Sequence, residues 1–108
     1  MNKWILPLVL LTAFLPSMSQ ADPYLVYGYG TQSCGWWIEE RKNDSSQASN
    51  AEGWITGFIS GYQYSGYALP NTDLSAMSAF VDNWCQENPL EGIGTAAGHL
   101  VDALYNKK

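Results

Sequence analysis

The first 21 residues constrain this chain more than any later feature. Lys3 precedes an apolar run over Ile5–Leu15, and Ser19-Gln20-Ala21 supplies small side chains where a signal peptidase cuts. An apolar run of roughly ten residues is shorter than the 20 or so that a membrane-spanning helix needs. We therefore predict a secretory signal peptide over residues 1–21 that is cleaved before Asp22. The mature protein should then have no membrane anchor and be periplasmic or secreted.

The expected mature chain is small and acidic. Lys3 is the only charged residue in the predicted signal peptide, so residues 22–108 keep 4 basic and 10 acidic side chains, a formal net charge of −6. This charge disfavours nucleic acid as a partner. The 87 residues that remain of 108 can bury only a modest core, so we expect a cross-link to add stability.

Two cysteines supply the expected cross-link. Cys34 and Cys85 both lie in the mature part, and an even number of cysteines in an exported chain favours a disulfide. Their separation of 51 residues closes a loop to which chain entropy assigns roughly 4 kcal/mol. A pair of free thiols is the alternative. The cysteines and His99 show no metal-ligand spacing, so no metal or other cofactor is expected.

Apolar residues recur with a helical period through most of the mature chain. The pattern predicts an all-α fold, a small bundle of about four helices in a single domain over residues 22–108, with a β-strand over residues 54–62 as a local alternative. Thr72 and Asn50 are the expected N-caps of two helices, and residues 43–50 are expected to form a loop. The predicted helices cover Gln32–Lys42, Ala51–Tyr64, Asp73–Asn88 and Leu90–Tyr105, with Leu90 on the inner face of the last.

Three glycines form a stripe along the second predicted helix. Gly53, Gly57 and Gly61 are spaced at i, i+4 and i+8, and each costs a helix about 1 kcal/mol relative to alanine. Close packing against another helix would compensate, and Gly94 and Gly98 in the last helix offer a matching surface. We therefore expect the stripe to be a helix-packing site, where leucine at position 57 would overpack the contact and destabilise the fold.

Aromatic residues are the best candidates for binding a protein partner. Adjacent helical residues differ in direction by about 100°, so if Trp37 faces the core, Trp36 is at least partly displayed. Tyr62, Tyr64 and Tyr67 cluster near the end of the glycine-bearing helix. Exposed aromatic side chains are favoured anchors in interfaces, although each could instead fill the core.

Catalysis has little support in the sequence. His99 and Asp102 could form an acid–base pair, but a solvated histidine is the simpler interpretation. The chain lacks a Gly-x-Ser-x-Gly elbow, a phosphate-binding glycine loop and a metal-binding histidine pair. We expect no enzymatic activity, and a hydrolase using His99 is the weakest of the functional hypotheses.

Several segments together resemble a known family. Ser33-Cys34 opens the first predicted helix, aromatic residues follow in the next, and Cys85 to Pro89 reads Cys-x-x-Asn-Pro at the end of the run from Asp73. This outline resembles the small periplasmic acid-stress chaperones HdeA/HdeB. The resemblance implies a protein that is dimeric near neutral pH, loosens in acid and covers unfolding client proteins. Neutralising ten carboxylates between about pH 5 and 2 would change the net charge from −6 to about +5.

A second group of exported proteins is similar in outline. Helical immunity proteins, which neutralise cell-wall-degrading effectors in the periplasm, share a glycine-spaced helix and a late cysteine. Members of the chaperone family are richer in lysine than this chain, whose mature part has Arg41, Lys42, Lys107 and Lys108 as its basic residues. The leading hypothesis is therefore a stress chaperone of the HdeA/HdeB type, and the alternative is an immunity or inhibitor protein for one secreted effector.

Overall fold

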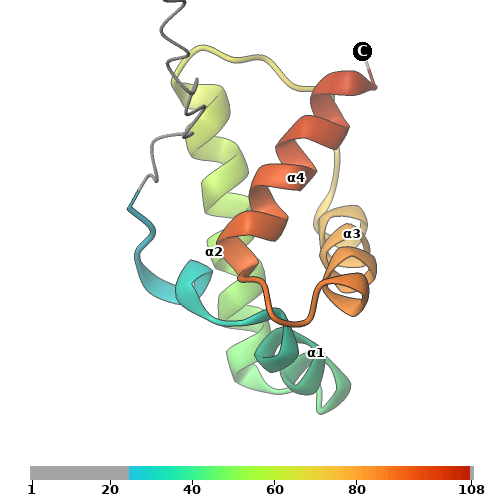
Figure 1. Ribbon diagram of the computed structural model, residues 1–108. Helices are drawn as coiled ribbons and strands as arrows, with labels where there is room; N and C mark the ends of the chain where they lie inside the picture. The colour runs from blue at the N-terminus through green and yellow to red at the C-terminus, as the bar shows by residue number, and fades with distance from the viewer. Residues whose placement is uncertain (1–24, 108) are drawn as a thin grey trace, which may run out of the picture.

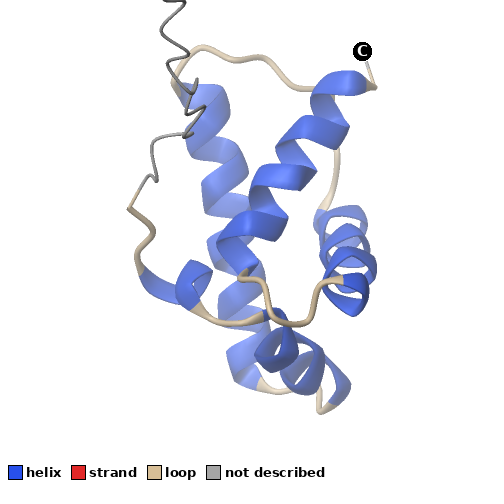
Figure 2. Cartoon of the chain, viewed as in Figure 1, coloured by secondary structure: helices blue, strands red, loops and turns tan. Residues whose placement is uncertain are grey.

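The computed structural model describes residues 25–107, so the predicted signal peptide, its cleavage site and Lys108 lie outside the described residues. The described part has a 3-10 turn, η1 (Gly28–Thr31), and four helices: α1 (Cys34–Lys42), α2 (Ser46–Tyr64), α3 (Leu74–Glu87) and α4 (Ile93–Asn106). No strand occurs in this part, only an isolated bridge between Ser33 and Gly92 (Figure 2). The predicted all-α bundle of about four helices is confirmed.

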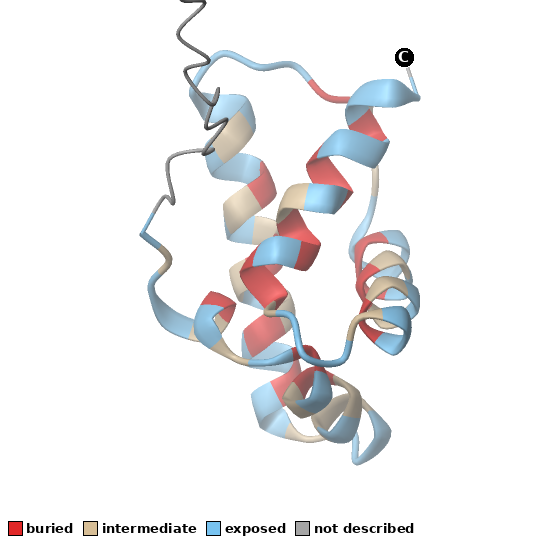
Figure 3. Ribbon diagram, in the orientation of Figure 1, coloured by how far each residue is buried: buried red, intermediate tan, exposed pale blue. Residues whose placement is uncertain are grey.

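The helices enclose one core. Figure 1 shows α2 and α4 running in the same direction, with α3 beside α4 and α1 near the start of α2. The buried faces of the helices turn toward one another (Figure 3). The turn η1 covers the end of the bundle at which α4 begins. The largest fully buried side chains are Trp37, Ile55, Ile59, Ile93 and Val81 together with the two cysteines.

The predicted disulfide joins α1 to α3. Cys34 and Cys85 are fully buried, and their Cα atoms lie 4.8 Å apart within the range of bonded cysteines. The bond links the first turn of α1 to the last turn of α3, inside the hydrophobic core. It therefore closes the long loop that contains α2.

Two helix starts differ from the sequence prediction. The side chain of Ser45 caps α2 by accepting from the amide of Ala48, so residues 46–50 are helical rather than a loop and Asn50 is not the cap. Burial of Ala48 favours this extra turn, because it adds apolar contact to the core. Similarly, Asp73 rather than Thr72 caps α3, through a 2.8 Å bond from the amide of Ala76.

The last helix starts later than its apolar pattern predicts. The carbonyls of Pro89 and Glu91 accept hydrogen bonds from the first amides of α1, at 3.0 and 2.7 Å. The segment before α4 is thereby held as a cap for α1, and α4 begins only at Ile93. Leu90 is consequently 97% exposed, so its predicted place on the inner face is wrong.

Close backbone approach occurs at a glycine that the sequence pattern did not single out. Gly30 of η1 lies against α2, where an added Cβ would sit 2.2 Å from the ring of Trp54. The same indole donates a 2.7 Å bond from Nε1 to the carbonyl of Tyr27. Gly94 of α4 in turn faces the carbonyl oxygen of Gly30, 3.1 Å from where its Cβ would lie. The segment before α1 is thus packed onto α2 and α4.

The glycine stripe of α2 does not pack against another helix. Gly53, Gly57 and Gly61 are exposed, and a Cβ added at any of them would meet no atom within 4 Å among the described residues. Each glycine follows a buried residue, Ala51, Ile55 or Ile59, by two positions, which is about 200° around a helix. The helix-packing prediction is therefore wrong, because the stripe lies opposite the buried face.

Candidate functional site

The four aromatic candidates lie in two separate places. Trp36 is half-buried on α1 near the start of α2, whereas Trp37 is fully buried. Tyr62, by contrast, is near the end of α2. It follows Gln47 by 15 residues, which places the two residues about 22 Å apart along the helix axis. Because Gln47 lies beside Trp36, the predicted residues form two surfaces rather than one.

The tyrosines form a surface at the end of α2. The rings of Tyr62 and Tyr67 stack with centroids 4.9 Å apart, although Tyr67 lies beyond the helix. Tyr64 does not join this stack and is 94% exposed. The predicted clustering thus holds for Tyr62 and Tyr67, and Tyr64 is an isolated aromatic side chain beside them.

An aromatic row continues from this pair along α2. Trp54, Phe58 and Tyr62 follow at i, i+4 and i+8, all half-buried, and Trp54 stacks on Phe58 with centroids 5.4 Å apart. Each of these residues comes directly after one of the exposed glycines. The row therefore borders a strip of helix where the backbone is not covered by side chains.

A groove between α2 and α4 lies next to the aromatic row. It encloses about 680 Å³, and its lining is largely apolar, with contributions from both helices. The sequence did not predict this groove, because it depends on how α2 and α4 lie side by side. Its lining residues are Phe58, Tyr62, Thr95, Gly98, His99, Val101 and Asp102.

His99 does not form the acid–base pair that the weakest hypothesis requires. Its ring stacks on Trp84 of α3 with centroids 4.9 Å apart, and among the described residues no hydrogen bond or ion pair joins it to Asp102. Both residues line the groove as exposed side chains. Within residues 25–107, no cluster of His, Cys, Asp or Glu has the arrangement of a metal site.

A polar network joins α1, α2 and α3 above the core. Arg41 makes a bidentate ion pair with Asp82, from Nε to Oδ1 at 3.0 Å and from Nη2 to Oδ2 at 2.7 Å. Trp37 donates from Nε1 to the same Oδ1 at 2.8 Å. Arg41 also lies 3.6 Å from Glu52, which accepts a 2.6 Å bond from Ser78. We call these five residues the Arg41 network.

The Arg41 guanidinium is the electrostatic centre of the network. Its hydrogen bonds to Asp82 raise the pKa of Arg41 above its ordinary value, against the opposing effect of partial burial, and the negative charges of Asp82, Glu52 and Asp44 raise it further. The guanidinium also lies over the Trp37 ring, 5.4 Å from its centroid. The sequence did not predict this role, because Arg41 stands between Glu40 and Lys42 in a charged segment and its partner Asp82 is 41 residues away.

Comparisons with protein-family models, with curated proteins and with solved structures find no match to this chain. Across residues 25–107, none of the helices is both long enough and apolar enough to cross a membrane. The candidate functional features of the described residues are the Arg41 network, the aromatic row with its groove, and the surroundings of Trp36.

Proposed function

We propose that this protein is a non-enzymatic binding protein of the bacterial envelope that holds unfolding proteins in acid, as the HdeA/HdeB chaperones that it resembles do. The observation that carries the proposal is the Arg41 network. Both ion pairs found among the described residues belong to it, and both use a carboxylate to connect α1 to another helix.

Acid acts on one side of these ion pairs. Carboxyl groups in proteins are mostly protonated below about pH 3, whereas a guanidinium stays charged. Protonation of Asp82 and Glu52 would remove both negative partners of Arg41 and leave its charge unpaired near the core. The ion pairs that connect α1 to α2 and α3 should then be lost together.

The disulfide limits how far this opening can go. The bond between Cys34 and Cys85 does not titrate, so α1 remains attached to α3 while its polar ties are lost. Movement of α1 would uncover Trp37, whose indole N–H bonds to Asp82 in the closed form. The newly exposed apolar surface would suit the binding of unfolded clients.

The test is client protection as a function of pH. Aggregation of several unrelated client proteins is measured between pH 7 and 2.5 with the wild type and with Asp82→Asn, which cannot form the ion pair at any pH. We expect protection by the wild type only in acid, and protection by Asp82→Asn to begin at a higher pH. Glu87→Gln, at an exposed position of the same helix α3, is the matched control and should behave as the wild type.

Two results would contradict the proposal. One is an absence of protection across the whole range while the protein stays in solution. The other is an identical onset for the wild type and Asp82→Asn. Sedimentation at pH 7 and 2.5 would test the homodimer that the resemblance implies, which should dissociate as protection appears.

A second candidate function has its own supporting observation. The uncovered glycines of α2 beside the aromatic row suit close contact with one folded partner at neutral pH, as an immunity protein for a secreted effector requires. Gly57→Arg should then abolish a stoichiometric complex with that effector at pH 7 without unfolding the protein. Equal affinity in the variant would argue against this function.

A further inference from the structure

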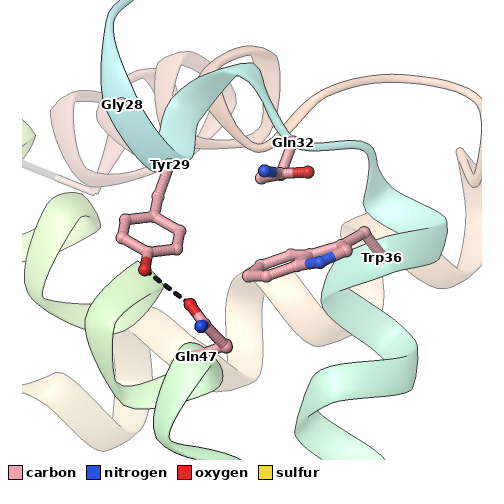
Figure 4. A pocket seen from close by; sticks show the side chains of 5 residues that line it. All are labelled: Gly28, Tyr29, Gln32, Trp36 and Gln47. Carbon is pink, nitrogen blue, oxygen red and sulfur yellow. Dashed lines mark hydrogen bonds between the residues drawn. The ribbon is translucent and has the colours of Figure 1, made fainter.

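We infer that the hollow around Trp36 is a binding site for neutral carbohydrate, a use separate from the proposed chaperone function. This hollow is open to solvent and has a volume of about 510 Å³, and the residues that line it are Gly28, Tyr29, Gln32, Trp36 and Gln47. That volume is within the range of small-molecule sites, about 300–1,000 Å³. Figure 4 shows the two aromatic rings and the two glutamine side chains arranged around a common opening.

The rings are held in place by contacts with one another and with neighbouring side chains. The Tyr29 hydroxyl donates to Gln47 Oε1 at 2.5 Å and accepts from Asn50 Nδ2 at 3.2 Å, so both of its hydrogen-bonding roles are filled. The Trp36 ring lies 5.8 Å from the Tyr29 ring, centroid to centroid, and its backbone amide is fixed by Ser33. A site built from fixed rings loses little conformational freedom when a ligand binds.

The amides leave unused hydrogen-bonding groups at the opening. No hydrogen bond joins the side-chain amide of Gln32 to another described residue, and Gln47 uses only its oxygen. Gln32 is tied by its backbone instead, donating to Tyr29 O and accepting from Ile93 N. Its side chain can therefore turn both a donor and an acceptor toward a ligand.

The chemistry of the lining selects the ligand class. None of the five residues carries an acidic or basic side chain, which leaves an ionic ligand without a partner. Sugar hydroxyls both donate and accept, as the glutamine amides do. The C–H groups on the face of a pyranose ring carry partial positive charge and pack on the negative face of an aromatic ring.

A proline-rich peptide is the competing ligand for an aromatic hollow. Such peptides dock in aromatic grooves as polyproline II helices and need donors for their carbonyl groups. The free Gln32 amide offers an acceptor as well as a donor, and proline residues have no N–H to donate to that acceptor, whereas sugar hydroxyls can serve both groups. The arrangement thus favours a neutral oligosaccharide.

The test uses the full chain, exported and purified, with three neutral probes: cellotetraose, chitotetraose and maltotetraose. Nitrogen–proton correlation spectra should show saturable shifts of the side-chain amides of Gln32 and Gln47 with at least one probe. Trp36→Ala should raise the dissociation constant at least tenfold, and Gln32→Leu, which preserves the volume of the side chain, severalfold. Tyr64→Ala is the matched control, because it removes an exposed aromatic ring elsewhere and should leave the affinity unchanged.

Three results would overturn the inference. The first is the lack of any saturable shift with all three probes, and the second is an unchanged affinity in Gln32→Leu. The third is binding of a ten-residue polyproline peptide that depends on Trp36 while no sugar binds, which would assign the hollow to peptides. If Trp36→Ala does not fold, Gln32→Leu and the amide shifts still decide the question.

Discussion

Arg41 and Asp82 are 41 residues apart in sequence and form a two-point ion pair between α1 and α3. The Asp82 oxygen that accepts from Arg41 Nε also accepts from the indole of Trp37. One carboxylate therefore fixes both the charged end of α1 and its largest core side chain. The disulfide also joins α1 to α3. This helix pair is therefore linked covalently at the start of α1 and by an ion pair near the end of α1.

Arg41→Lys should lower the free energy of unfolding at pH 7 by roughly 1–2 kcal/mol. Lysine keeps the charge but cannot reproduce the two parallel hydrogen bonds or the stacking on Trp37. Urea denaturation followed by tryptophan fluorescence measures the change. Lys42→Ala, at the exposed neighbouring position, is the control, with an expected change within about 0.5 kcal/mol. Equal effects of the two substitutions would show that the pair contributes no more than an ordinary surface charge.

The stabilisation from this pair should be lost in acid and kept in mild alkali. A base whose pKa is raised in the folded state contributes stability that is complete below its unfolded pKa and is lost only as pH rises through the folded pKa, which for arginine lies in strong alkali. Between pH 6 and 10 the unfolding free energies of wild type and Asp82→Asn should therefore differ by a constant amount. In strong acid that difference should shrink, because protonation of carboxylates leaves the side chain at position 82 uncharged in the wild type, as it is at every pH in the asparagine variant. A difference that persists at pH 2.5 would mean that Asp82 acts through its shape and not its charge.

Periodicity predicted the helices well where the apolar face was continuous. In α3 the buried face includes Met77, Val81 and Cys85, and the helix lies within one residue of its predicted bounds at each end. The start of α2 was missed because residues 46–50 are mostly polar with low helix propensity, and burial of Ala48 overrides that preference. The disulfide was predictable because it needed only the number of cysteines and the expected compartment.

The candidate sites were harder to predict because they depend on the arrangement of the helices. A sequence pattern places Trp36 and Gln47 on separate helices but does not bring them to one hollow. The Arg41 network likewise combines three helices, so no local motif reveals it. For the glycines, spacing showed that they share a face, and only the structure shows that this face is turned away from the core.

Reduction of the Cys34–Cys85 bond should lower the unfolding free energy by roughly 2–5 kcal/mol, because opening a 51-residue loop increases the freedom of the unfolded chain. Denaturation with and without a reductant measures the loss, and quantitative thiol labelling verifies the redox state. The double variant Cys34→Ala/Cys85→Ala is a control that should match the reduced protein closely. A loss well under 1 kcal/mol would show that packing alone holds α1 on α3.

Two glycine substitutions should have opposite effects on stability. Gly57→Ala should raise the unfolding free energy by up to about 1 kcal/mol, because alanine is the better helix former and its Cβ would meet no atom within 4 Å. Gly30→Ala should lower it by roughly 1–3 kcal/mol, because the new Cβ would displace the Trp54 ring, and with it the bond from Trp54 to Tyr27. Thermal unfolding followed by circular dichroism gives both values from matched single-methyl additions. If Gly57→Ala melts below the wild type, the α2 glycines are covered in solution, and a second copy of the chain would then be sought on that face by sedimentation.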